Sequence, residues 1–210
     1  MQTIDILWKD EHLLVVNKPP GLLTVPGRGP DKQDCLINRL LVPYPNSRIV
    51  HRLDQPTSGI VIVPQSYTAL KHIGRQFETR QVSKEYIAVV AGLVDADSGQ
   101  VNLPLICDWP NRPRQMVDHE NGKNALTHYR VLERREGDST TRISLTPVTG
   151  RSHQLRVHML SLGHPIVGDH LYAPPEIAQR EPRLLLHARH IEFRHPLSEE
   201  ILTITCEPNF

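Results

Sequence analysis

Short apolar runs separated by charged or turn-forming residues dominate the pattern of this chain. Ile4–Trp8 and Leu13–Val16 are two such runs with charged residues between them, which predicts two strands. Gly59–Val63, with the sequence GIVIV, is continuous and β-branched, which is typical of a strand buried on both faces. Further strands are predicted at residues 83–91, 101–106, 125–133, 141–147, 190–194 and 201–206.

Helical spacing is confined to three segments. Apolar side chains recur every three or four positions over residues 66–79, which predicts an amphipathic helix, and residues 35–41 predict a shorter one. Ser152 suits an N-cap before an apolar stripe that ends at Gly163. Because several predicted strands follow one another directly, the pattern favours an α+β fold with a mixed, largely antiparallel central sheet flanked by helices and loops.

The remaining segments are loops, and the length predicts one domain. Residues 17–21 and 24–34 are rich in proline and glycine, and residues 108–124 form a long polar connection. A chain of 210 residues predicts a single domain, with room for two lobes and for a large core. No stretch of ~18 apolar residues could cross a membrane, and no signal peptide precedes the first strand.

The cysteines and the charge limit the possible functions. Cys35, Cys107 and Cys206 are odd in number and far apart, which indicates neither a zinc ribbon nor a disulfide framework and favours a reducing compartment. We therefore expect a cytoplasmic protein. The formal net charge is only +1, so a nucleic-acid partner would have to meet a local basic face. Arginines do cluster, at 112 and 114 and at 151 and 156, whereas those at 134 and 135 are interpreted as solvated surface.

One acidic residue, Asp54, lies in a Pro/Thr/Ser/Gly turn just before the buried strand, in the segment IVHRLDQPTSG at 49–59. Such a turn fixes an exposed loop on a rigid element, where reactive groups are usually mounted. An equally open alternative is that Asp54 only forms an Asx-turn.

A basic segment, TGRSHQLRVH at 149–158, places Arg151 just before a predicted helix N-terminus. Free main-chain donors and a guanidinium together can bind a carboxylate or a phosphate, although Arg151 could instead pair with a surface acid. His153 and His158 are five residues apart, unlike the i, i+4 spacing of a zinc-binding pair, so no metal site is expected. Tyr86 falls in an apolar strand, where core packing with a bonded hydroxyl is the default interpretation.

Five segments, taken together, resemble the RluA family of pseudouridine synthases in order and approximate spacing. They are NKPPGLLTVPG at 17–27, HRLDQPTSG at 51–59, SKEYIAVV at 83–90, TGRSHQLRVHMLSLGHPIVGD at 149–169 and RLLLHA at 183–188. The resemblance covers residues 8–190. It implies that residues 1–210 form one pseudouridine synthase catalytic domain, without the separate N-terminal S4-type RNA-binding module of several relatives.

The resemblance also implies roles for four residues. Asp54 matches the catalytic aspartate of the family. Tyr86 matches the active-site tyrosine that stacks against the target base, with participation in proton transfer as a second role that the resemblance leaves open. Arg151 matches the basic residue that pairs with the catalytic carboxylate, and Arg52 matches a position that helps to hold the RNA open. A close guanidinium keeps a carboxylate ionised where burial alone would neutralise it, which suits an Asp54–Arg151 pair.

The implied reaction breaks the bond from C1′ to N1 of uracil and rejoins the base through C5, so it needs no cofactor. The implied partner is structured RNA, because PLICDWPNRPRQ at 104–115 resembles the dual-specificity members that act on a 23S rRNA stem-loop and a tRNA anticodon stem-loop. The enzyme is expected to act as a monomer that flips the target base out of the RNA. Phosphate contacts are expected from Arg112, Arg114 and Arg156, and Trp109 either stacks on a base or packs its loop onto the domain.

Three alternatives remain open at the level of sequence. One is a non-enzymatic RNA-binding factor, which would predict a lost aspartate or a degraded arginine motif. Another is a hydrolase that pairs Asp54 with a second carboxylate ~5–9 Å away, for which Asp108 and Asp169 are the candidates. The third is a family member that modifies only one RNA.

Overall fold

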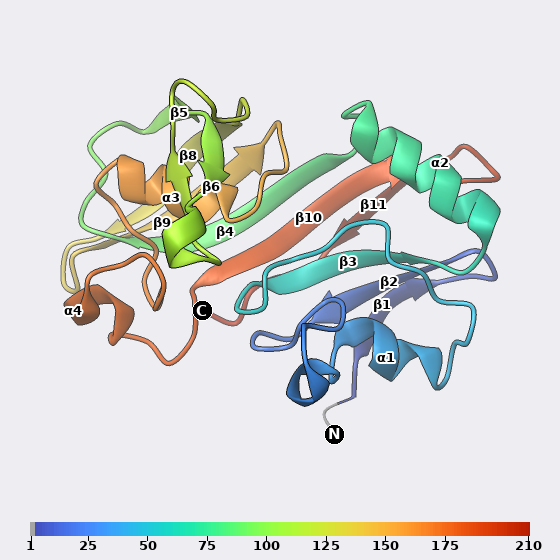
Figure 1. The fold of residues 1–210 in the computed structure, drawn as a ribbon. Helices are drawn as coiled ribbons and strands as arrows, with labels where there is room; N and C mark the ends of the chain where they lie inside the picture. Colours follow the sequence, from blue (N-terminus) through green and yellow to red (C-terminus); the bar gives the residue numbers. More distant parts are fainter. Residues whose placement is uncertain (1–2) are drawn as a thin grey trace. The chain divides into compact units, whose positions relative to one another are not determined.

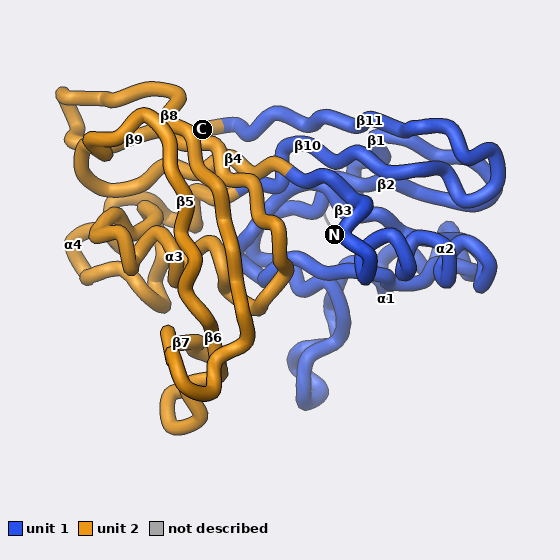
Figure 2. Tube along the Cα trace, turned by 90° about the horizontal axis from the view of Figure 1, so that it is seen from above, with its two compact units in different colours: residues 1–84, 187–209 blue, residues 85–186, 210 orange. Residues whose placement is uncertain are grey.

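A computed structural model describes residues 3–210, and Figure 1 labels its helices and strands in chain order. The chain divides into two compact units, coloured separately in Figure 2. Unit 1 consists of Met1–Lys84 and His187–Asn209, and unit 2 of Glu85–Leu186 and Phe210. No helix in the described part of the chain has the length and apolar character that a membrane crossing requires.

Unit 1 contains strands and two helices. The strands are β1 (Asp5–Lys9), β2 (Leu13–Lys18), β3 (Ser58–Pro64), β10 (Leu186–Arg194) and β11 (Ile201–Thr205). Their order is β1-β2-β3-β10, with β11 also on β10, and every pair is antiparallel except β3 with β10. The helices α1 (Leu36–Leu41) and α2 (Tyr67–Glu78) lie on one face of these strands (Figure 2), and a 3-10 turn covers Pro30–Lys32.

The core of unit 1 forms where α2 meets the strands. Ala69 and Ile73 of α2 pack against Ile60 of β3 and Phe193 of β10, and all four are at most 2% exposed. All seven residues of β3 are buried, as the GIVIV run predicts. This strand gives the loop that precedes it a rigid mounting.

Unit 2 contains four paired strands and a separate hairpin. The four strands are β4 (Ser83–Ala91), β5 (Ser98–Asn102), β8 (Leu126–Arg135) and β9 (Thr140–Pro147). Their order is β4-β9-β8-β5, and every neighbouring pair is antiparallel. The hairpin pairs β6 (Leu105–Cys107) with β7 (Gln115–Val117), and a 3-10 turn at Trp109–Asn111 lies between them. The helices are α3 (Gln154–Ser161) and α4 (Pro175–Ala178).

The α+β class with mostly antiparallel pairing is confirmed. The strand predicted at 101–106 is wrong in detail, because it is two strands that separate at Leu103 and Pro104, where proline cannot donate to a ladder. The connection at 108–124 contains β7, which its polar composition concealed. The short helix α4 was not predicted either.

Candidate active site

Asp54 lies in a short loop, residues 53–57, that leads directly into β3; we call it the Asp54 loop. The side chain is half-buried, and the main-chain N–H of Thr57 donates to the carbonyl of Asp54 at 3.1 Å, which closes a turn. Leu53 before it and Thr57 after it are buried. The carboxylate therefore sits between two anchored residues.

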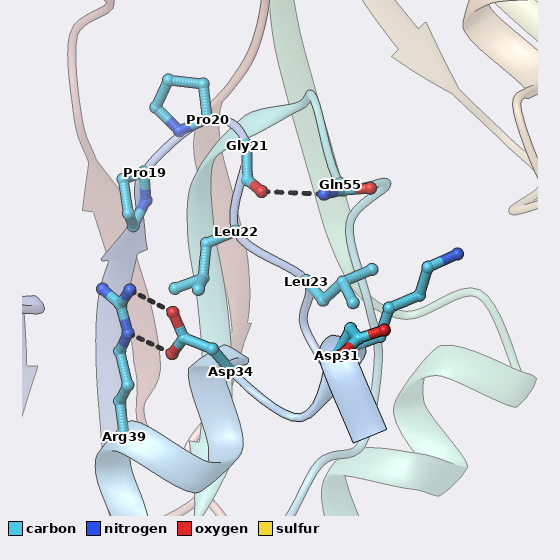
Figure 3. Close-up of a pocket in the computed structure, with 10 residues that line it drawn as sticks. Pro19, Pro20, Gly21, Leu22, Leu23, Asp31, Asp34, Arg39 and Gln55 are labelled. Carbon is cyan, nitrogen blue, oxygen red and sulfur yellow. Dashed lines mark hydrogen bonds and ion pairs between the residues drawn. The ribbon is translucent and has the colours of Figure 1, made fainter. Parts of the chain in front are cut away.

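A second loop, residues 19–24, holds the Asp54 loop in place; we call it the clamp loop. The N–H of Gly21 donates to the carbonyl of Gln55 at 2.9 Å, and the amide of Gln55 donates back to the carbonyl of Gly21 at 3.0 Å (Figure 3). The hydroxyl of Thr24 donates to the carbonyl of Leu53 at 2.9 Å and accepts its N–H at 3.2 Å. Gly21 has φ +81°, a conformation that glycine adopts without strain.

Lys18, at the end of β2, is fully buried behind the clamp loop. Its ammonium group donates to the carbonyls of Pro19 at 2.9 Å, Leu22 at 2.7 Å and Gln55 at 3.1 Å. Sequence reasoning missed this residue and treated its segment only as a turn. The available signal was the strand alternation, which puts Lys18 on the same face as Val16, a buried residue.

A pocket of about 320 Å³ lies beside the two loops and is lined by Gly21 and Gln55 among others (Figure 3). Its far wall carries Arg39, which binds both carboxylate oxygens of Asp34 at 2.7 Å. This ion pair raises the pKa of Arg39 and lowers that of Asp34. On this wall of the pocket, the charges of Arg39 and Asp34 therefore neutralise each other.

His51, three residues before Asp54, contacts β3 and α2. Its Nε2 accepts the N–H of Ile62 in β3 at 2.8 Å, and its ring lies 4.6 Å from the ring of Phe77. Burial, with a smaller contribution from the positive charge of Lys84, lowers the pKa of His51 to about 3. His51 is thus a neutral structural residue at neutral pH, whereas its neighbour Arg52 is exposed.

Tyr86 lies in β4 of unit 2, opposite Leu145 of β9. The side chain is half-buried and packs against the core cluster that includes Leu145 and Leu155. Core packing therefore accounts for part of the ring, as the apolar surroundings predict.

Arg151 is exposed just before α3, and its Nε donates to the carbonyl of Asn124 at 3.1 Å. The prediction that Ser152 caps α3 is wrong: His153 is the N-cap residue, with φ 54°, and makes no capping hydrogen bond from its side chain. The side-chain oxygen of Gln154, the first residue of α3, accepts the N–H of Arg151 at 3.0 Å and so orders the turn before the helix. The amide of Gln154 also donates to Leu126 and Thr127 of β8, which fixes this side chain in place.

Arg156 does not fit the predicted phosphate contact. Its side chain is 4% exposed, and it binds both carboxylate oxygens of Asp169 at 2.7 and 2.8 Å. The sequence spacing could not reveal this, because the partner lies 13 residues further along, beyond the end of α3. Asp169 is engaged in turn by the N–H groups of Leu171 and Tyr172, so it is a poor second carboxylate for a hydrolase.

The other predicted RNA-binding residues of unit 2 lie on the β6–β7 hairpin. Trp109 is 65% exposed, and the guanidinium of Arg112 lies 4.3 Å from the centre of its ring. Packing of the loop onto the domain therefore does not explain Trp109. Arg114 is half-buried, with its guanidinium 5.3 Å from the ring of Tyr172. Asp108 accepts the side-chain amide of Asn111 within the turn.

Within residues 3–210, no three side chains of His, Cys, Asp or Glu are grouped closely enough to hold a metal ion. Of the residues that the sequence predicted to be catalytic, Asp54 belongs to unit 1, whereas Tyr86 and Arg151 belong to unit 2.

Comparisons with known proteins identify relatives along nearly the whole chain. A family model described as RNA pseudouridylate synthase matches residues 12–161. The dual-specificity RNA pseudouridine synthase RluA of Pasteurella multocida (strain Pm70) is 50% identical over 207 residues, which cover 99% of this chain and 94% of the relative. The protein of that name from Escherichia coli (strain K12) is 49% identical over 205 residues, covering 98% and 93%.

Solved structures agree with these matches. Human RNA Pseudouridylate Synthase Domain Containing 1 superimposes with a TM-score of 0.84 at 30% identity, covering 99% of this chain and 84% of the human one. Human RNA Pseudouridylate Synthase Domain Containing 4 gives a TM-score of 0.78 at 27% identity, covering 98% and 89%.

Proposed function

The chain belongs to the RNA pseudouridylate synthase family, and from this premise we propose that it isomerises specific uridines of 23S rRNA and tRNA to pseudouridine. The proposed dual specificity rests on relatives of that name about 50% identical to nearly the whole chain. The structural observation that carries the proposal is the carboxylate of Asp54 on a loop anchored by the clamp loop and β3.

Asp54 is the residue on which catalysis depends. The reaction breaks the C1′–N1 bond of uridine and forms a C1′–C5 bond, while C5 loses a proton and N1 gains one. A carboxylate can serve this reaction by attacking C1′ or C6, or by acting on the proton of C2′. A loop tied by main-chain hydrogen bonds suits all three routes, because the carboxylate must stay in place while the uracil turns.

Tyr86 and Arg151 assist Asp54 in this proposal. Tyr86 stacks against the target base, and Arg151 keeps the carboxylate ionised and oriented. Arginine suits this role because its guanidinium stays protonated and binds a carboxylate through two parallel hydrogen bonds. The family motifs around both residues support the assignment.

Structured RNA is the partner, and the target uridine is flipped out of its loop. Arg112 and Arg114 are the proposed phosphate contacts, and Arg52 is the basic side chain proposed to hold the RNA open; all three are exposed or half-buried. We leave Arg156 out of this set because Asp169 already occupies its guanidinium. The enzyme is proposed to act as a monomer in the cytoplasm, which sedimentation at micromolar concentration and cell fractionation would check.

The deciding experiment uses RNA labelled with tritium at C5 of uridine. The purified protein should release tritium from a 23S rRNA stem-loop and from a tRNA anticodon stem-loop, and Asp54→Asn should release none. Release from only one RNA would favour a single-target enzyme, and free uracil would indicate a hydrolase. RNA binding without release by the wild-type protein would favour a non-enzymatic factor.

A further inference from the structure

The tip of the β6–β7 hairpin is ordered by its own hydrogen bonds. The N–H of Asp108 donates to the carbonyl of Arg114 at 3.0 Å, and the N–H of Arg114 donates to the carbonyl of Asn111 at 3.1 Å. The side-chain amide of Asn111 reaches both carboxylate oxygens of Asp108 at 3.0 and 3.1 Å. The turn therefore holds its shape without help from a ligand.

Trp109 projects from this turn with an unusual degree of exposure for an indole, 65%. The guanidinium of Arg112 covers one face of the ring at 4.3 Å, and its Nε donates to the carbonyl of Trp109 at 3.2 Å, which fixes the two side chains together. Arg112 covers one face of the indole ring, and most of the remaining ring surface is exposed to solvent. A planar group such as a nucleic-acid base could therefore stack on the ring. Figure 2 shows the hairpin projecting from the other strands of unit 2.

The base of the hairpin is tied to the start of α3. The N–H of Gln115 in β7 donates to the hydroxyl of Tyr172 at 2.7 Å, and the same hydroxyl lies 2.6 Å from Nδ1 of His153. His153 is the N-cap residue of α3, two positions after Arg151. The exposed indole is thus mounted on the same framework as the arginine assigned to the reaction.

We propose that Trp109 and Arg112 form a stacking platform for an unpaired base of the RNA loop other than the uridine that is isomerised. The inference rests on the proposed function, which makes RNA the partner, and it adds a second nucleotide-binding site. Every base has a flat π-face, so such a platform accepts different sequences and suits an enzyme with more than one RNA target. Arg112 also places a positive charge where the backbone of that nucleotide passes.

Tryptophan fluorescence tests the platform directly, because the chain has two tryptophans, Trp8 and Trp109. In Trp8→Phe, a stem-loop RNA should quench the emission of Trp109. An abasic nucleotide at one loop position other than the target should abolish the quenching and raise the dissociation constant about 5- to 150-fold, the effect of losing one base–aromatic stack. RNA binding without quenching, or quenching that survives every abasic substitution, would overturn the proposal.

Substitutions at the tip of the hairpin provide a second test of the platform. Trp109→Ala should raise the dissociation constant by a similar factor and make it insensitive to the abasic position, while Trp109→Phe should retain most of the affinity. Met116→Ala is the matched control, because Met116 is an exposed apolar side chain of the same hairpin, 42% exposed. If Trp109→Ala does not fold, the quenching measurement in Trp8→Phe still decides.

The two proposals fail separately. Quenching by RNA without tritium release would support the stacking platform and reject the isomerase activity. Tritium release without quenching would support the isomerase activity and reject the platform.

Discussion

At the scale of single residues, the buried ammonium group of Lys18 donates to three carbonyl groups, those of Pro19, Leu22 and Gln55. Lys18→Met keeps the volume but removes the donors, so buried carbonyls lose their partners at a cost of ~1–3 kcal/mol each. We expect the free energy of unfolding to fall by about 3 kcal/mol or more. Urea denaturation measures this, and Lys32→Met, an exposed lysine of the same region, should change nothing.

Turnover by Lys18→Met should fall as well, because one of the three carbonyls belongs to Gln55, next to Asp54. A variant that is destabilised yet converts uridine at the wild-type rate would show that the clamp loop does not position Asp54.

Arg151 should matter for activity and little for stability. Its side chain is exposed, so Arg151→Lys should leave the unfolding transition unchanged. Lysine keeps the positive charge but loses the two-pronged geometry, and we expect turnover at saturating RNA to fall about 10- to 100-fold. Arg135→Lys is the control, because Arg135 pairs with Glu133 at the surface. Wild-type turnover in Arg151→Lys would refute the proposed partnership with Asp54.

At the scale of elements, Gly59 allows the parallel contact between β3 and β10. Its φ is +115°, and a Cβ atom there would lie 2.3 Å from the carbonyl oxygen of Ala188. This oxygen belongs to the main chain of β10, so it could move away only if the strand itself shifted. Gly59→Ala should therefore lower the free energy of unfolding by about 3 kcal/mol or more. Gly137→Ala is the control, because a Cβ atom there would have no neighbour within 4 Å. Equal melting temperatures for the two variants would contradict this account.

The elements that sequence predicted well are those whose pattern is local. The β-branched run at 59–63 and the periodic segment at 66–79 became β3 and α2 because burial and spacing agree along one stretch of chain. The misses depend on distant partners: the buried ammonium group of Lys18 donates a hydrogen bond to a carbonyl 37 residues away, and the side chain of Gln154, which orders the turn before α3, is held by β8. The turn chemistry at 53–57 correctly indicated a mounted carboxylate, whereas the role of Asp54 came from the family motifs.

At the scale of the whole molecule, each unit holds a histidine whose pKa is lowered by desolvation. Burial lowers the pKa of His51 in unit 1 to about 3 and also lowers that of His158 in unit 2. Between pH 6.5 and pH 3, His51 binds a proton in the unfolded chain but stays neutral in the folded one. The contribution of neutral His51 to the free energy of unfolding is therefore fully present above pH 6.5 and is lost as the pH falls towards 3. Between pH 7.5 and 5.0, His51 alone should remove about 2 kcal/mol.

Urea denaturation at several pH values measures this loss. His51→Gln retains an acceptor for the N–H of Ile62 and should flatten the dependence on pH, while the exposed His128→Gln should not. An unchanged slope in His51→Gln would mean that other groups cause the acid sensitivity.

The net charge of +1 means that RNA affinity cannot come from the field of the whole molecule and must come from local contacts. Each phosphate contact contributes about 0.7–0.9 to the slope of log affinity against log salt. Arg52→Gln and Arg114→Gln should each reduce that slope by about this amount, whereas Arg135→Gln should not. Arg156→Gln should instead destabilise the fold, since it strands the buried carboxylate of Asp169, and leave the slope intact. If the salt slope fell in Arg156→Gln and not in Arg52→Gln or Arg114→Gln, the proposed RNA-binding face would be wrong.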